Sequence, residues 1–295
     1  MLEFPISGVE TWWWLPIIVS FGVSCITSTA GLSGAFVLLP FQVSILGYTT
    51  PGVTPTNLLF NVFAIPGGVY KLTREKRMVW PLVWTMTIGT LPGLLVGVIV
   101  RVKYLPDPTA FKFFVGCVLL YIAVRLWQSV IKVKTEKKQA GAFIVIPRVF
   151  SLREIVYEFN GMEYRVPTLT LGFLSAIVGG IGGIYGIGGG AILAPILVTL
   201  YGLPIHTVSG AALCSTFVSS VVGVLLYLTV GQYFSADGQT ASPDWLLGGM
   251  LGVGGFVGIY LGAAVQKYLP SRLIKSLLGV IMLYIAARYI VGYFL

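Results

Sequence analysis

The sequence predicts an all-α integral membrane protein that consists of two five-element helical repeats in inverted topology, about ten membrane elements in all. Of its 295 residues, 56% are hydrophobic and 10% are charged, and the mean hydropathy is +0.91. Soluble domains carry about 25% charged residues. Lipid accepts an apolar exterior that water does not, so the composition favours a chain embedded in a bilayer.

Eight apolar regions follow one another, and the second four repeat the first four. Gly31-Leu-Ser-Gly34 aligns with Gly186-Ile-Gly-Gly189, and Leu120-Tyr-Ile-Ala-Val-Arg125 aligns with Leu283-Tyr-Ile-Ala-Ala-Arg288. Several short matches in the same order indicate an internal duplication. The regions cover approximately residues 12–46, 54–72, 79–100, 109–131, 168–201, 208–230, 245–266 and 272–294.

The first region of each repeat is too long for one membrane span. Residues 12–46 would extend about 50 Å as one helix, whereas about 20 residues cross a bilayer core. Glycines interrupt both regions, at 31–34 and 186–190, and Pro40 and Pro195 follow them. We therefore expect the first two helices of each repeat to form a glycine-broken hairpin or a pair of half-helices.

Five elements per repeat is an odd number, which reverses the orientation of the second repeat. With residues 133–166 in the cytoplasm, 15 of the 19 Lys and Arg residues lie on the cytoplasmic side, against 13 for parallel repeats. The positive-inside rule thus favours inversion. We expect a multi-pass protein of the cell membrane with both termini extracytoplasmic. Its parts are repeat 1 (1–132), a cytoplasmic linker (133–166) and repeat 2 (167–295).

The linker contains the pattern of a β-hairpin. The segments Ile155-Val-Tyr-Glu-Phe159 and Met162-Glu-Tyr-Arg-Val166 flank Asn160-Gly161. An Asn-Gly pair supplies the positive φ angles of a type I′ turn. We expect a hairpin here, as a lid or a strut.

The glycine breaks are the first candidates for a binding site. A broken helix leaves backbone N–H groups unpaired at membrane depth, and such groups bind anions with help from the helix dipole. Inverted repeats with broken helices are typical of transporters. Close helix packing is the alternative explanation for glycines. The candidate residues are Gly31, Ser33 and Gly34 in repeat 1, and Gly186, Gly188, Gly189 and Gly190 in repeat 2.

Polar residues that follow each break are the second candidates. Thr54 and Ser209 occupy aligned positions, and each is expected to be a helix N-cap, with Pro55 in the first turn. Amide and hydroxyl groups one turn on would face the centre between the repeats. Ordinary capping and interhelical hydrogen bonds are the alternative. These candidates are Thr54, Thr56, Asn57, Asn61, Ser209, Ser215 and Thr216.

Other features point to packing or exclude other functions. The stripes Gly89, Gly93, Gly97 and Gly254, Gly258, Gly262 are typical of close helix contacts, and they would suit a homodimer. The Lys and Arg clusters are explained by the positive-inside rule and not by nucleic-acid binding. We expect no enzyme activity, because the apolar regions contain no set of catalytic groups. We expect no cofactor and no metal, and a small anion and the lipid bilayer as partners.

These motifs resemble those of the sulfite exporter TauE/SafE family of membrane transporters. The similar residues are Gly31 to Pro40, Gly186 to Pro195, and Ser209-Gly-Ala-Ala-Leu213. The resemblance implies transport of sulfite or an organosulfonate such as sulfoacetate, and it leaves direction and coupling open. A passive anion channel and, less favoured, a membrane-embedded enzyme or receptor are the alternatives.

Overall fold

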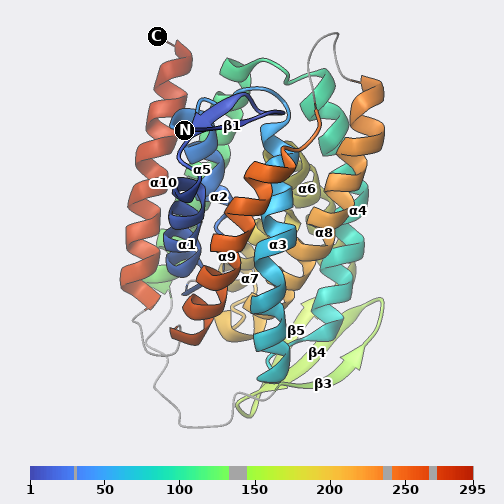
Figure 1. The fold of residues 1–295 in the computed structure, drawn as a ribbon. Coiled ribbons are helices and arrows are strands. Elements are labelled where there is room, and N and C mark those ends of the chain that lie inside the picture. Colours follow the sequence, from blue (N-terminus) through green and yellow to red (C-terminus); the bar gives the residue numbers. More distant parts are fainter. Residues whose placement is uncertain (30–31, 133–144, 235–240, 266–270, 295) are drawn as a thin grey trace.

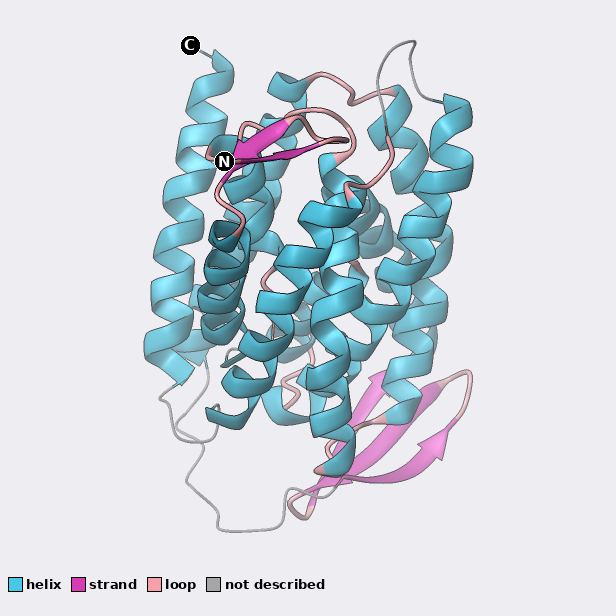
Figure 2. Ribbon diagram, viewed as in Figure 1, coloured by secondary structure: helices cyan, strands magenta, loops and turns pink. Residues whose placement is uncertain are grey.

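The structure is a computed structural model that describes the whole chain except residues 30–31, 133–144, 235–240, 266–270 and 295. Its described part is mainly helical (Figures 1 and 2). The helices are α1 (Trp14–Thr29), α2 (Ala35–Ser44), α3 (Val53–Arg74), α4 (Trp80–Lys103), α5 (Pro108–Lys132), α6 (Thr168–Tyr185), α7 (Gly189–Leu200), α8 (Ile205–Phe234), α9 (Trp245–Val265) and α10 (Ser271–Phe294). The strands are β1 (Leu2–Phe4), β2 (Val9–Thr11), β3 (Val145–Phe150), β4 (Glu154–Phe159) and β5 (Met162–Pro167).

Six of the described helices, α4, α5, α6, α8, α9 and α10, are long and apolar enough to cross a membrane. Three others are shorter than the roughly 20 residues that a span needs: α1 has 16 residues, α2 has 10 and α7 has 12. Both long first regions are therefore broken, as predicted. The predicted prolines, Pro40 and Pro195, lie inside the short helices α2 and α7.

The glycine stripes bring two pairs of helices into close contact. α4 packs on α6, where a Cβ atom at Gly93 would lie 1.8 Å from the Ala176 carbonyl oxygen. α1 packs on α9, where a Cβ atom at Gly254 would lie 2.0 Å from the Ile17 carbonyl oxygen. The packing role is confirmed. Both stripes are used within the chain, and the possible homodimer stays a prediction.

The predicted hairpin is present as β4 and β5. The strands pair antiparallel, with Glu154 opposite Pro167, and the turn residues Asn160 and Gly161 have φ angles of 52° and 74°. A third strand that the sequence analysis did not foresee, β3, pairs antiparallel with β4. This sheet lies at the end of the bundle opposite both termini (Figure 1).

The sheet is tied to the helices by buried hydrogen bonds. Tyr157 donates from its hydroxyl group to Thr207 Oγ1 over 2.9 Å, because the Thr207 hydroxyl itself donates to the Pro204 carbonyl. Burial raises the pKa of Tyr157 well above its ordinary value, so the phenol remains a donor. The start of α8 and strand β4 are thus joined.

The N-terminal residues form a second small hairpin, β1–β2, which was not predicted. Phe4 and Val9 are buried in the main core. Ser7 donates from its backbone N–H and its hydroxyl group to Asp244 Oδ2, over 2.9 and 2.7 Å. Asp244 precedes α9 and accepts a hydrogen bond from the Leu247 N–H, so it caps that helix.

Candidate functional site

The break between α6 and α7 has a backbone conformation that favours glycine. Gly186 ends α6 in the left-handed region at φ 82°, and Gly188 precedes α7 at φ 71°. Residues with a Cβ atom rarely adopt such angles. α7 therefore begins inside the bundle, two residues after Ile187, which is fully buried.

Helix α3 holds one side of this break through two buried amides. Asn57 donates both hydrogens of Nδ2 to backbone carbonyls, one to Gly186 over 3.0 Å and one to Ala35 over 2.9 Å. Asn61 Nδ2 donates to the Ile187 carbonyl over 3.3 Å. Because Ala35 begins α2, Asn57 joins the two helix breaks to each other.

Helix α8 lies on the other side of the same break. The Gly189 N–H donates to Ser219 Oγ over 3.3 Å. A Cβ atom at Gly190 would lie 2.0 Å from the Ala212 carbonyl oxygen and 2.7 Å from Thr216 Oγ1. The glycines of this break therefore let α7 approach α8 at backbone distance, which leaves no space for larger side chains.

The first break, between α1 and α2, is connected to the second. The Leu32 N–H donates to the Thr27 carbonyl, and Gly34 precedes α2. The Tyr185 hydroxyl at the end of α6 donates to the Phe36 carbonyl over 2.7 Å. Together with Asn57, this bond places the beginning of α2 next to the α6–α7 break. Gly31 lies outside the described residues.

Two predicted hydroxyl groups are buried without a hydrogen-bond partner. Ser33 is 1% exposed and Ser215 is 0% exposed, and the structure gives neither Oγ atom a partner. Ser33 lies in the α1–α2 break. Ser215 lies on the face of α8 that carries Ala212 and Ser219, at helical spacing. An unsatisfied buried donor costs about 1–3 kcal/mol, so each hydroxyl is suited to a ligand that accepts a hydrogen bond.

Two capping predictions are wrong. α3 begins at Val53 after Gly52, so Thr54 lies within the first turn and is not the N-cap. α8 begins at Ile205, so Ser209 lies inside the helix and donates to the Ile205 carbonyl over 2.6 Å. In both cases the helix starts soon after a proline, Pro51 or Pro204, and earlier than the candidate cap.

Not every predicted site residue lies at the breaks. Thr56 donates to the Gly52 carbonyl and accepts hydrogen bonds from Tyr48 and the Asp244 N–H. Its hydroxyl group is therefore used to hold the start of α9. Ser209 lies six residues before Ser215, about 9 Å along α8, towards the sheet.

Arg101 is a buried charged residue that was not among the predicted site residues. The structure puts it in the last turn of α4, where it is 0% exposed and donates from Nε to Thr54 Oγ1 over 3.1 Å. Thr54 in turn donates to the Ile184 carbonyl over 3.2 Å. A signal was available: Arg101 continues the four-residue spacing of Gly89, Gly93 and Gly97, which marks the buried face of α4.

Tyr48 is another buried polar group near this region. Burial raises the pKa of its hydroxyl well above the ordinary value, against a smaller lowering by the hydrogen bond with Thr56. The hydroxyl therefore stays protonated and uncharged. Tyr48 lies within electrostatic reach of both Asp244 and Arg101.

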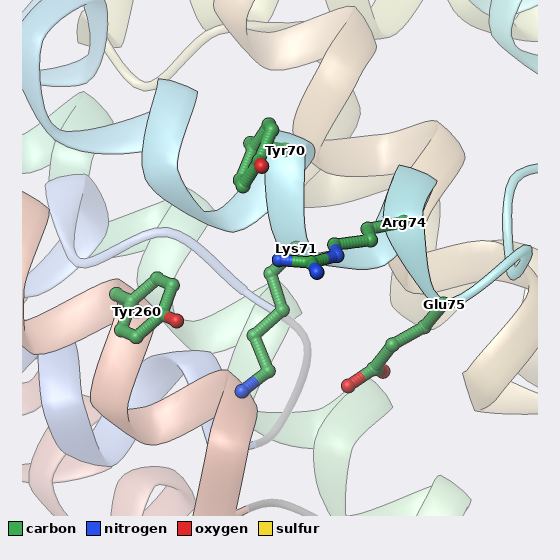
Figure 3. A pocket seen from close by; sticks show the side chains of 5 residues that line it. All are labelled: Tyr70, Lys71, Arg74, Glu75 and Tyr260. Atoms are coloured by element: carbon green, nitrogen blue, oxygen red, sulfur yellow. The ribbon is translucent and has the colours of Figure 1, made fainter.

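A surface hollow of about 360 Å³ lies at the carboxyl end of α3 (Figure 3). Lys71 and Arg74 line it on α3, and Tyr260 faces them from α9, with its ring centroid 4.9 Å from Lys71 Nζ. Glu75 also lines the hollow and pairs with Arg77 over 3.1 Å. Its basic lining attracts anions, but the hollow is at the surface and does not contain the helix breaks.

Across the described residues, no group of three or more His, Cys, Asp or Glu could hold a metal ion.

Comparisons with known proteins find relatives that match most of the chain. The chain is 22% identical to the probable membrane transporter protein YunE of Bacillus subtilis (strain 168), over 93% of this chain and 96% of the relative. It is 21% identical to the probable membrane transporter protein YjnA of the same organism, over 90% of this chain and 95% of the relative. No solved structure matches the chain. The family model described as sulfite exporter TauE/SafE matches residues 16–289, so the chain belongs to the TauE/SafE family of membrane proteins.

Proposed function

We propose that the protein is a secondary transporter that moves a small sulfur-containing anion, sulfite or an organosulfonate such as sulfoacetate, across the cell membrane. The family and the names of the relatives support a membrane transporter. The six long apolar helices support a chain that crosses the membrane several times. The anion binds between the two halves of the chain, at the glycine breaks.

The observation that carries this proposal is that the hydroxyl groups of two predicted site residues, Ser33 and Ser215, are buried without a partner; Ser24, Thr87 and Ser220 share this property but were not predicted site residues. A sulfite or sulfonate group has several oxygen atoms that accept hydrogen bonds, and it must lose its hydration to enter the protein. Hydroxyl donors and the positive end of α7, which begins at Gly189, replace part of that hydration. Asn57 positions the breaks and does not itself offer a free donor, because both Nδ2 hydrogens are occupied.

The proposal includes inverted repeats, α1–α5 and α6–α10. In these repeats α1 corresponds to α6, and α4 corresponds to α9. Exchange of the two repeats therefore turns the contact between α1 and α9 into the contact between α6 and α4. Both contacts occur, and both use a glycine stripe. α5 packs on α10, its own counterpart. This exchange supports a two-fold relation between the halves, with alternating access by movement of one half against the other.

The test compares Ser33→Ala and Ser215→Ala in proteoliposomes with radiolabelled sulfite. If these hydroxyls serve the anion, flux falls by about tenfold or more, whereas the melting temperature in detergent stays the same or rises. Removal of an unsatisfied buried hydroxyl does not weaken the fold, so function and stability change in different directions.

Ser209→Ala is the matched control, because it removes a buried hydroxyl of the same helix that is already satisfied within α8. It is expected to leave flux unchanged. Unchanged flux in both Ser33→Ala and Ser215→Ala would refute this site. Flux that rises linearly without saturation, with single-channel currents, would indicate a passive channel instead.

A further inference from the structure

Arg101 is the largest side chain among the fully buried residues of the described structure. A guanidinium group keeps its charge under all ordinary conditions. Burial of a charge in a membrane protein is costly unless another group compensates it, and such residues commonly lie on a substrate pathway. The role of Arg101 therefore depends on which neighbouring groups bind its guanidinium and compensate its charge.

Three contacts hold the guanidinium group and leave one nitrogen free. Nε donates to Thr54, Nη1 donates to the Leu105 carbonyl, and Cζ lies 3.8 Å from the centroid of the Phe111 ring. Nη2 is buried and has no partner. The side chain is thus fixed in one orientation while both hydrogens of Nη2 remain available to an acceptor.

The described residues compensate this charge in part but provide no counter-ion. No carboxylate within the described ranges forms an ion pair with Arg101. Asp244 lies in the same region, but its oxygen atoms accept hydrogen bonds from Ser7 and from the Leu247 N–H. The carboxyl end of α4 contributes a partial negative charge, whereas the nearby amino end of α3 contributes a positive one. Within the part of the chain that the structure describes, no full negative charge pairs with Arg101.

Arg101 is connected to the helix break through one side chain. Thr54 accepts from Arg101 and donates to the Ile184 carbonyl, and a Cβ atom at Gly186 would lie 2.5 Å from the Thr54 carbonyl oxygen. Tyr227 donates to the Gly183 carbonyl over 2.8 Å, so the end of α6 is held from a second side. An anion on Nη2 would therefore lie close to the break.

We propose that Arg101 is the counter-charge of the transported anion: its free Nη2 binds an oxygen atom of the sulfite or sulfonate group beside the break at Gly186. This inference rests on the proposed function and adds a charged residue to the proposed site. The anion completes the hydrogen bonds of the guanidinium and neutralises it. Arg101 thereby selects for negative charge, which the uncharged hydroxyls of Ser33 and Ser215 cannot do alone.

The experiment measures the concentration dependence of sulfite flux in proteoliposomes for wild type, Arg101→Met and Arg101→Lys. Arg288→Met is the control, since it removes an exposed arginine from α10. Loss of a charged hydrogen bond is expected to raise KM about tenfold or more in Arg101→Met. Arg101→Lys retains the charge but not the planar group, so its KM is expected to rise less, by at least about threefold. Arg288→Met is expected to leave KM unchanged.

A purely structural role for Arg101, as a link between α4 and Thr54, gives a different result. It would lower the maximal rate and the melting temperature and leave KM unchanged, and this result would overturn the inference. If Arg101→Met does not give a monodisperse protein, the KM of Arg101→Lys becomes the test. An unchanged KM in Arg101→Lys also overturns the inference that Arg101 binds the anion. A wild-type protein that moves no sulfur anion would instead refute the proposed function itself.

Discussion

Replacement of Asn57 with leucine removes three buried hydrogen bonds that join the two helix breaks. Asn57 donates to Ala35 and to Gly186, and it accepts from Gln42 Nε2 over 3.0 Å. Leucine has a similar size but no polar atom, so two carbonyls lose the hydrogen bond from Asn57, and the Gln42 amide keeps only its 3.4 Å hydrogen bond to the Leu38 carbonyl. Interhelical hydrogen bonds in membrane proteins contribute about 0.6 kcal/mol on average and about 1.7 at most. Three of them give a loss of about 2–5 kcal/mol.

The assay for Asn57→Leu combines thermal unfolding in detergent with sulfite flux in proteoliposomes. We expect a lower melting temperature and loss of flux, while insertion into the membrane continues because the apolar helices are unchanged. Asn61→Leu is the milder comparison, since Asn61 Nδ2 donates one hydrogen bond of 3.3 Å, to the Ile187 carbonyl. Its loss is expected to stay below about 2 kcal/mol. Equal stability and full flux in Asn57→Leu would refute the argument that this amide holds the breaks together.

Three further predictions test the fold. Gly93→Ala forces a Cβ atom into the Ala176 carbonyl and should destabilise the α4–α6 contact by about 1–3 kcal/mol. Gly172→Ala is the control, because no atom lies within 4 Å of its Cβ position; equal melting temperatures of the two variants would contradict this prediction. Asp244→Ala should lower the free energy of unfolding by about 0.5–2 kcal/mol, because it removes the cap of α9. Asp107→Ala should lower it less, because the hydrogen bond of Asp107 to the Ala110 N–H is exposed; thermal unfolding of both variants tests this order. After replacement of Cys25, Cys117 and Cys214, an impermeant maleimide added to whole cells should label Glu3→Cys and not Ser151→Cys; the opposite pattern would reject the proposed orientation.

Features that depend on local chemistry were predictable from the sequence. Gly186 and Gly188 adopt the positive φ angles that break the α6–α7 region, and Asn160-Gly161 forms the expected turn. The glycine stripes on α4 and α9 pack against neighbouring helices, because a spacing of four residues places them on one face.

Features that depend on tertiary contacts were not predictable in the same way. Thr54 and Ser209 look like caps, but the helices begin earlier, and Thr54 instead binds Arg101 and Ile184. A proline in the first turn fits either start, because the N–H groups there have no acceptor within the helix.

The burial of Arg101 was likewise not predictable from local sequence, because it depends on tertiary contacts. Its position near the end of an apolar region is typical of an arginine that reaches the membrane surface. Its burial depends on Phe111 and Thr54, which come from other helices. Its spacing of four residues from Gly97 is the only local sign of a buried face.

A flux assay with a panel of anions tests the central claim most directly. Sulfite, thiosulfate, sulfoacetate, taurine and sulfate are offered separately to proteoliposomes that contain the wild-type protein or the double variant Ser33→Ala/Ser215→Ala. We predict saturable flux of at least one sulfur oxyanion in the wild type and a loss of about tenfold or more in the double variant. Flux of all five compounds at the rate of protein-free liposomes, or equal flux in the two proteins, would contradict an anion site at the helix breaks.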